Sequence, residues 1–221
     1  PAALGLLLAR TDPVHPVVVV LDRTAPRRVV ANAEALAAAG RVRVARSDGV
    51  LAGNDARNLG AAGATTRWIA FVDDDAVPSP GWLDALVAEG DRRDAAVAYP
   101  AYLTYGADGR LTVHGLGADL VVEEGPGGRW LREVQHHLRE PWDEVAPGLE
   151  PVERLQPELH CALVRRELLD DGGGLDEALL GWFDHTDLAL RVRPAGASPW
   201  LGPSATSVSW IPPPLRLVDT A

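Results

Sequence analysis

The chain has 221 residues, of which 47% are hydrophobic and 24% are charged, a composition typical of a folded domain with a substantial core. The net charge of −10 argues against non-specific binding of nucleic acid, but it is compatible with a nucleotide held by a metal ion and local arginines. The sequence contains no run of about 18 apolar residues, so it predicts no membrane span. The single cysteine excludes an internal disulfide. We therefore expect a cytoplasmic domain, with any membrane association left to parts outside this chain.

Strand and helix patterns alternate along the first hundred residues. In chain order we expect a helix at 1–9, a strand at 17–21, a helix at 29–39, a strand at 42–44, a helix at 54–64, a strand at 68–72, a helix at 82–90 and a strand at 95–99. This alternation predicts βαβ units and a mostly parallel sheet. Residues 101–157 have poor periodicity and are interpreted as a variable insertion, with a hairpin across 102–103 and 111–113. The remaining expected elements are a strand at 160–164, a helix that starts at 165–169, a helix at 184–193 and a strand at 206–210.

Three consecutive carboxylates, Asp73, Asp74 and Asp75, follow the apolar run at 68–72. They lie at the carboxyl end of a predicted strand, where open α/β sheets bind ligands. Neighbouring carboxylates raise one another's pKa unless a positive charge lies between them, and a divalent cation is the usual one. Because alternate residues of an extended segment point the same way, Asp73 and Asp75 can face one ion while Asp74 points elsewhere. An acidic turn without a ligand is the alternative.

Four segments together resemble the family-2 glycosyltransferases with the GT-A fold. They are residues 17–22, 54–60, 68–82 and the pair 174–177 with 184–191. The resemblance implies a Rossmann-like αβα sandwich that forms a single domain over 1–221, with a nucleotide-binding half at 1–100 and an acceptor-side half at 101–221. It also implies that the first strand of the sheet is missing, because Pro1 already lies in the helix that should follow that strand.

The resemblance implies transfer of a sugar from a nucleotide-diphosphate sugar to a hydroxyl of a carbohydrate or other acceptor, with inversion. A bound Mg²⁺ or Mn²⁺ would stabilise the departing diphosphate. On the family pattern, Asp73 touches the ribose or the metal and Asp75 ligates the ion directly. Asp74 belongs to the same nucleotide-binding segment.

Two residues outside the acidic triplet are also expected to contact the donor. Asp22 would hydrogen-bond the nucleotide base, although an aspartate in a turn at the end of a strand fits the sequence too. Arg57 would lie near the phosphates. A surface arginine paired with Asp55 or Asp73 is an equally good interpretation of Arg57.

A base must take the proton from the acceptor hydroxyl, and the resemblance places it in residues 184–191. The family's Glu-Asp pair is Asp184-His185 here, so its usual base aligns with His185. Three assignments of the base remain open. Asp184 could act from one position earlier, or His185 could act, since its ordinary pKa is about 6.5. The two could also act together, with Asp184 orienting His185. We expect the two to act jointly and assign Asp184 first. The alternative is a helix N-cap at Asp184 with His185 on the surface.

The acceptor side is expected near His160 and Trp182. Trp182 lies beside the expected base, where an indole can stack on a sugar ring. A buried, hydrogen-bonded histidine and a core tryptophan are the alternatives. Many relatives supply a histidine ligand near the end of the last strand, but residues 207–210 contain none. The cation is therefore expected to rely on Asp75 and the diphosphate.

Two other functions fit parts of the sequence. A sugar-phosphate nucleotidyltransferase shares the βαβ half, but residues 174–177 would have no role in it. A degenerate, non-catalytic GT-A domain that binds a nucleotide or a partner fits the altered base pair, the missing strand and the absent histidine.

Overall fold

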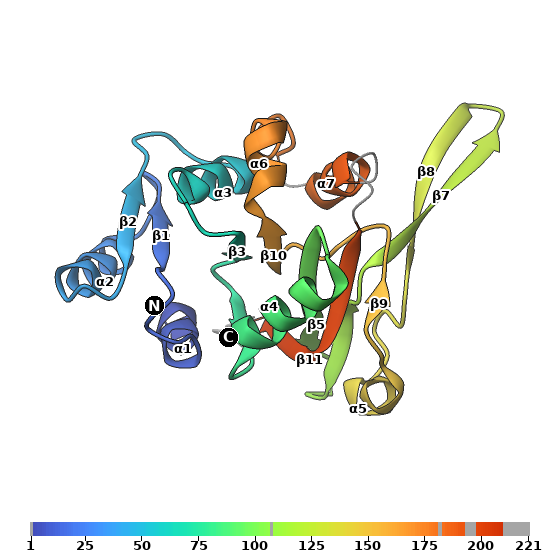
Figure 1. Cartoon of the computed structure of the whole chain (residues 1–221), viewed down its shortest axis with the longest axis horizontal. Coiled ribbons are helices and arrows are strands. Elements are labelled where there is room, and N and C mark those ends of the chain that lie inside the picture. Colours follow the sequence, from blue (N-terminus) through green and yellow to red (C-terminus); the bar gives the residue numbers. More distant parts are fainter. Residues whose placement is uncertain (1, 107, 181–182, 193–197, 210–221) are drawn as a thin grey trace, which may run out of the picture.

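The structure is a computed structural model of the chain, and it describes residues 2–106, 108–180, 183–192 and 198–209 (Figure 1). The helices are α1 (Ala2–Arg10), α2 (Arg27–Ala38), α3 (Gly53–Ala61), α4 (Trp82–Arg93), α5 (Trp142–Val145), the 3-10 helix η1 (Ala146–Gly148), α6 (Arg166–Gly172) and α7 (Asp184–Val192). The strands are β1 (Val18–Leu21), β2 (Arg43–Arg46), β3 (Trp68–Val72), β4 (Ala76–Pro78), β5 (Val97–Tyr105), β6 (Leu111–Gly115), β7 (Ala118–Gly125), β8 (Gly128–Gln135), β9 (Val152–Glu153), β10 (Cys161–Arg165) and β11 (Pro199–Ser209). None of the described helices is long and apolar enough to cross a membrane.

The central sheet has seven strands and is mixed. Its main path runs β3-β10-β5-β11-β4, with β6 on β5 and β9 on β11. β10 is antiparallel to both β3 and β5, and β11 is parallel to β5, so β3, β5 and β11 run in one direction. The core strands are thus mostly parallel, as expected, and β10 runs in the opposite sense between two of them.

Helices cover both faces of this sheet, which confirms the αβα architecture. Along β10, Ala162 and Val164 pack into a core to which α6 and α7 contribute. Cys161 and Leu163 pack on the opposite face with Trp82 of α4. This alternation is the two-residue period of a strand that is buried on both faces. Cys161 is fully buried and is a small residue of this core.

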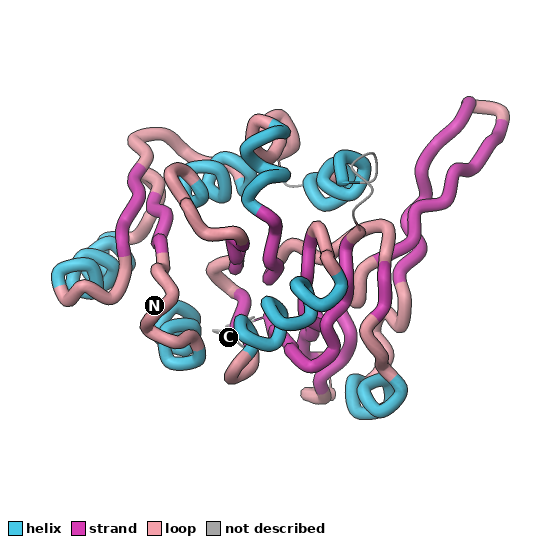
Figure 2. Tube along the Cα trace, in the orientation of Figure 1, coloured by secondary structure: helices cyan, strands magenta, loops and turns pink. Residues whose placement is uncertain are grey.

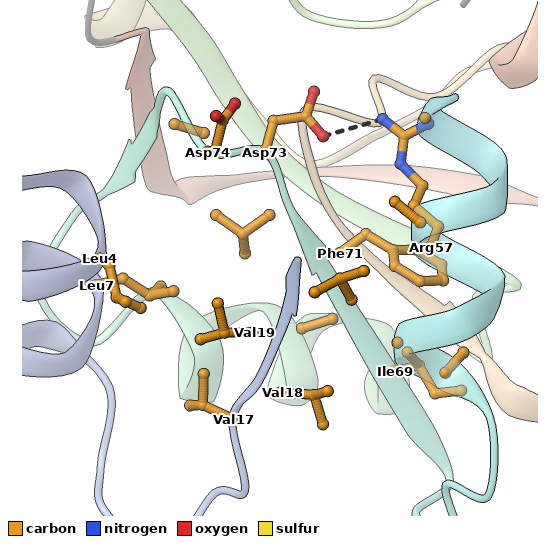
Figure 3. A pocket seen from close by; sticks show the side chains of 18 of the residues that line it. Leu4, Leu7, Val17, Val18, Val19, Arg57, Ile69, Phe71, Asp73 and Asp74 are labelled. Carbon is orange, nitrogen blue, oxygen red and sulfur yellow. Dashed lines mark hydrogen bonds and ion pairs between the residues drawn. The ribbon is translucent and has the colours of Figure 1, made fainter. Parts of the chain in front are cut away.

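A cavity of about 1480 Å³ is lined by residues of both β1 and β3. β1 pairs with β2 in a separate two-stranded parallel sheet, and within the described ranges β3 pairs only with β10. Figure 3 shows apolar side chains of α1, β1 and β3 around this space, among them Leu7, Val18 and Phe71, with Asp73 and Asp74 at one end. Residues of the β1–β2 pair and of the central sheet thus line one common cavity.

The region at 101–157 is more regular than its sequence predicts. The expected hairpin is present as the antiparallel pair β5–β6. The unpredicted element is a long two-stranded ribbon, β7–β8, which extends away from the rest of the chain (Figures 1 and 2).

Candidate active site

The three aspartates form a turn that joins β3 to β4. The backbone N–H of Asp73 donates to the carbonyl of His160 at 2.9 Å, which continues the pairing of β3 with β10 by one residue. The N–H of Ala76 then donates to the Asp73 carbonyl at 3.0 Å and closes the turn. Asp73 and Asp75 are half-buried while Asp74 is exposed, as the alternation of an extended segment predicts.

Arg57 joins this turn to the start of α7. Its Nη2 donates to Asp73 Oδ1 at 3.0 Å, and its Nη1 donates to Asp184 Oδ2 at 2.7 Å. The Arg57 side chain is only 13% exposed, and that of Asp184 is 10% exposed. The two acidic motifs, 111 positions apart in the sequence, thus share one guanidinium group. Burial raises the pKa of Asp73 above its ordinary value, despite the opposing charge of Arg57.

Two asparagines of α3 hold the segment that precedes α7. The buried Asn54 donates to the carbonyl of Asp176 at 2.8 Å. Asn58 donates to the carbonyl of Leu175 and accepts from its N–H, both at 2.8 Å. Gly174 approaches Asn58 so closely, with φ of +91°, that a Cβ there would lie 2.8 Å from the amide oxygen. No role is predicted for these asparagines from the sequence, although both lie in a segment that resembles the family-2 glycosyltransferases.

Asp184 and His185 form a coupled pair. Asp184 Oδ1 accepts from the His185 backbone N–H at 3.0 Å and lies 3.1 Å from the ring Nδ1. Burial raises the pKa of Asp184, but the hydrogen bond from His185 and the charge of Arg57 outweigh it, so this pKa is lowered well below its ordinary value. The pKa of His185 is raised, because its contact with Asp184 outweighs the opposing effect of burial. Asp184 therefore orients the imidazole through Nδ1, and Nε2 is the ring nitrogen that does not contact Asp184.

A hard cation would find oxygen ligands at Asp75. Its carboxylate is half-buried and accepts a hydrogen bond from Ser209 Oγ at 3.2 Å. Carboxylate and hydroxyl oxygens suit Mg²⁺ or Mn²⁺, so this donor set fits the ion that the resemblance implies. Asp73, the other expected ligand, is engaged by Arg57, and its role as a metal ligand stays a prediction.

Asp22 lies at the end of β1 and lines the same cavity. Its Oδ1 accepts from the Thr24 N–H at 2.8 Å and from the Thr24 hydroxyl at 2.6 Å, while its Oδ2 accepts from the Leu51 N–H at 3.1 Å. These hydrogen bonds lower its pKa, that of Thr24 most. The carboxylate thus organises the loops after β1 and β2, and contact with a nucleotide base remains a prediction.

His160 belongs to a second polar group on the acceptor side. Its Nδ1 pairs with the carboxylate of Glu158, and its ring stacks on Tyr102 with centroids 4.5 Å apart. His160 thus has the hydrogen bond of the expected alternative, a buried histidine, but its side chain is 38% exposed rather than buried. His114, Glu158 and His160 place one ligand atom each within 4.8 Å of one another, which would suit a metal ion. Trp182, the expected sugar platform, lies outside the described residues.

The fold and the site together define an α/β domain with acids and a histidine at the mouth of a large cavity. The family model described as "Glycosyl transferase family 2" matches residues 2–173. This chain therefore belongs to glycosyl transferase family 2.

Relatives with curated names are similar over part of their length. The pre-mycofactocin glycosyltransferases of two Mycobacterium tuberculosis strains, CDC 1551 / Oshkosh and ATCC 25618 / H37Rv, are each 31% identical over 143 residues. The alignment covers 64% of this chain but only 26% of each relative, so the chain spans about a quarter of their length.

Among solved structures, "GalNAc-T7 with UDP, GalNAc and Mn2+" is similar with a TM-score of 0.68 and 15% identity. The match covers 94% of this chain and 40% of that one. At this identity the likeness establishes the fold, which is the GT-A fold.

Proposed function

We propose that this domain transfers a sugar from a nucleotide-diphosphate sugar to an acceptor hydroxyl, in a single inverting displacement assisted by a divalent cation. The observation that carries the proposal is the double contact of Arg57 with Asp73 and Asp184. It holds a candidate donor-binding acid and the orienting partner of a candidate base against one cavity, where donor and acceptor must meet.

The comparisons support this proposal from two sides. Membership of glycosyl transferase family 2 supports glycosyl transfer as the class of reaction. The similar GalNAc-T7 structure contains UDP, GalNAc and Mn²⁺, which supports a nucleotide-sugar donor and a divalent cation here. Under this proposal residues 1–100 bind the nucleotide and residues 101–221 face the acceptor.

The position of each residue suggests whether it contacts the nucleotide or the cation. Asp22, Asp73 and Asp74 line the cavity and would contact the nucleotide. Arg57 lines the same cavity, and its positive charge would attract a diphosphate. Asp75 and Ser209 would hold the cation, which when bound stabilises negative charge on the departing diphosphate.

We assign the proton transfer to His185, with Asp184 as its orienting partner. Both oxygens of Asp184 are occupied, one by Arg57 and one by His185, so this carboxylate is a poor proton acceptor. The neutral imidazole of His185 can take the acceptor proton at Nε2, and the Asp184 carboxylate stabilises the resulting imidazolium. Asp184→Asn should therefore impair proton transfer although Asp184 itself accepts no proton.

Hydrolysis of a panel of nucleotide-diphosphate sugars, with Mn²⁺ or Mg²⁺, tests this proposal. Asp75→Asn and His185→Ala should each lower the rate at least about 100-fold, the lower range for loss of a general base. Asp143→Asn removes an exposed carboxylate on α5, and its rate should equal that of the unchanged protein.

Unchanged hydrolysis in both site variants would refute the assignment. Calorimetry with nucleoside diphosphates provides a second readout. Nucleotide binding without turnover of any sugar in the panel would instead identify a degenerate, non-catalytic domain.

A further inference from the structure

Three side chains from two separate parts of the chain converge beside the candidate active site. His114 lies on β6, whereas Glu158 and His160 lie in the segment that leads into β10. One ligand atom from each lies within 4.8 Å of the other two. We propose that His114, Glu158 and His160 bind a divalent transition-metal ion, separate from the cation at Asp75.

The chemistry of the three side chains favours a transition metal over Mg²⁺. Two imidazole nitrogens and one carboxylate oxygen are a ligand set typical of Zn²⁺ with an open fourth position. Imidazole also suits copper, iron or nickel, whereas Mg²⁺ prefers an all-oxygen shell. With bonds of about 2.1 Å, tetrahedral ligand atoms lie about 3.4 Å apart. Because no two of the three ligand atoms lie more than 4.8 Å apart, the largest adjustment needed is about 1.4 Å, a shift that rotation of side chains can supply.

The backbone places His114 in this group through a β-bulge. Tyr102 of β5 is opposite Gly115, but the next residue, Leu103, is opposite Val113. His114 is therefore the extra residue of β6, and a bulge of this kind re-aims a side chain. The absence of a side chain at Gly115 serves the same group, because a Cβ there would lie 2.3 Å from Glu158 Oε2.

Aromatic packing holds both imidazoles. The buried Tyr102 stacks on the His160 ring with an interplanar angle of 13° and meets the His114 ring edge-on, with centroids 5.3 Å apart. His114 and His160 also meet edge-on at 5.4 Å. Rings fixed in this way lose little further entropy when they bind an ion.

The group belongs to the same cleft as the candidate active site but does not include its acids. Glu158 and His160 line the cavity together with Asp73 and His185. Asp75 is held separately by Ser209 on β11. An ion at His114, Glu158 and His160 would therefore add positive charge on the acceptor side without using the proposed donor ligands.

Titration of the metal-free protein with Zn²⁺, in the absence of nucleotide, tests this proposal by calorimetry. One equivalent should bind, and His114→Ala and His160→Ala should each weaken it at least about tenfold, since even loss of an outer-shell partner has this effect. Co²⁺ in place of Zn²⁺ gives a visible absorption spectrum that reports nitrogen ligands and should be lost in the same variants. Because His114 is exposed, its replacement should leave the fold intact, which circular dichroism checks.

Two matched variants make the result specific. His136→Ala removes a histidine that pairs with Asp119 on the ribbon, and Zn²⁺ binding should not change. Asp75→Asn should also retain the Zn²⁺ equivalent, whatever it does to sugar transfer. Equal Zn²⁺ affinity in the unchanged protein and in both histidine variants would overturn the proposal, and so would loss of the ion in Asp75→Asn. Neither outcome depends on whether the domain is an active transferase.

Discussion

Arg57→Met should destabilise the domain by about 3 kcal/mol at neutral pH, because removal of one partner leaves buried charges uncompensated. Methionine keeps the aliphatic stem but removes the guanidinium that joins Asp73 to Asp184. The contact with Asp184 should contribute most, about 2 kcal/mol, because both side chains are nearly buried, at 13% and 10% exposed. The contact with Asp73, which is 31% exposed, should contribute about 1 kcal/mol because water screens it.

Urea unfolding, followed by the fluorescence of the seven tryptophans, measures this loss as a function of pH. The pKa of Asp184 is lowered in the folded state, so its stabilising contribution is complete above the unfolded value of about 3.9. That contribution is lost as the pH falls through the folded value. The difference between Arg57→Met and the unchanged protein should therefore be largest near neutrality and shrink below about pH 4.

The matched control is Arg110→Met, which breaks an ion pair whose side chains are 47% and 70% exposed. Water screens an exposed pair of this kind, so this variant should unfold almost like the unchanged protein. Equal losses in the two variants, or a loss in Arg57→Met that does not change with pH, would refute the bridging role of Arg57.

Three further changes test other parts of the site. Gly174→Ala should cost about 1–3 kcal/mol in urea unfolding, because the residue has φ of +91° and adjoins Asn58, whereas Gly127→Ala, with open space around it, should cost much less. Asp184→Asn should lower the pKa of His185 toward about 6.5. Because the rising limb of the pH–rate profile needs neutral His185, this limb should move to lower pH. A limb that does not move would exclude His185 as the base. Removal of divalent ions with a chelator should abolish sugar transfer and added Mn²⁺ should restore it; full activity after chelation would exclude metal assistance.

The element that the sequence predicted best is the strand with the clearest local signals. β3 has the predicted bounds, because an apolar run that ends in three acids leaves little choice of register. β11 begins at Pro199 rather than at 206, because its first half contains two prolines and a glycine, which usually mark loops. Its pairing with β5, a strand remote in the sequence, overrides these local signals.

The ribbon β7–β8 escaped prediction because it packs little against the core. Its exposed side chains need not alternate between apolar and polar, so its sequence lacks the period that burial imposes. What stabilises the ribbon is cross-strand pairing, such as the ion pairs Glu123–Arg132 and Glu124–Arg129. The glycines of the turn at 125–128 were the available signal for a hairpin.

Motifs on short segments were visible in the sequence, whereas partners from distant segments were not. The acids at 73–75 and the pair Asp184-His185 follow from local patterns. The proximity of His114 and Glu158 does not follow from local patterns, because the two residues are 44 positions apart. The pairing of β6 with β5 and the bulge at His114 bring them together. The histidines that the sequence placed side by side, His136 and His137, instead pair separately with Asp119 and Glu140.

The partner of Arg57 shows how local structure decides between candidates that the sequence cannot separate. Both Asp55 and Asp73 were open as partners. Asp55 lies in the first turn of α3, where its carboxylate accepts from the Ala52 N–H at 2.8 Å and satisfies the start of the helix. Asp55 is thus already engaged, so the guanidinium turns toward the sheet, where Asp73 and the unforeseen Asp184 both offer oxygens. The same geometry that stabilises α3 therefore also joins the two halves of the candidate site.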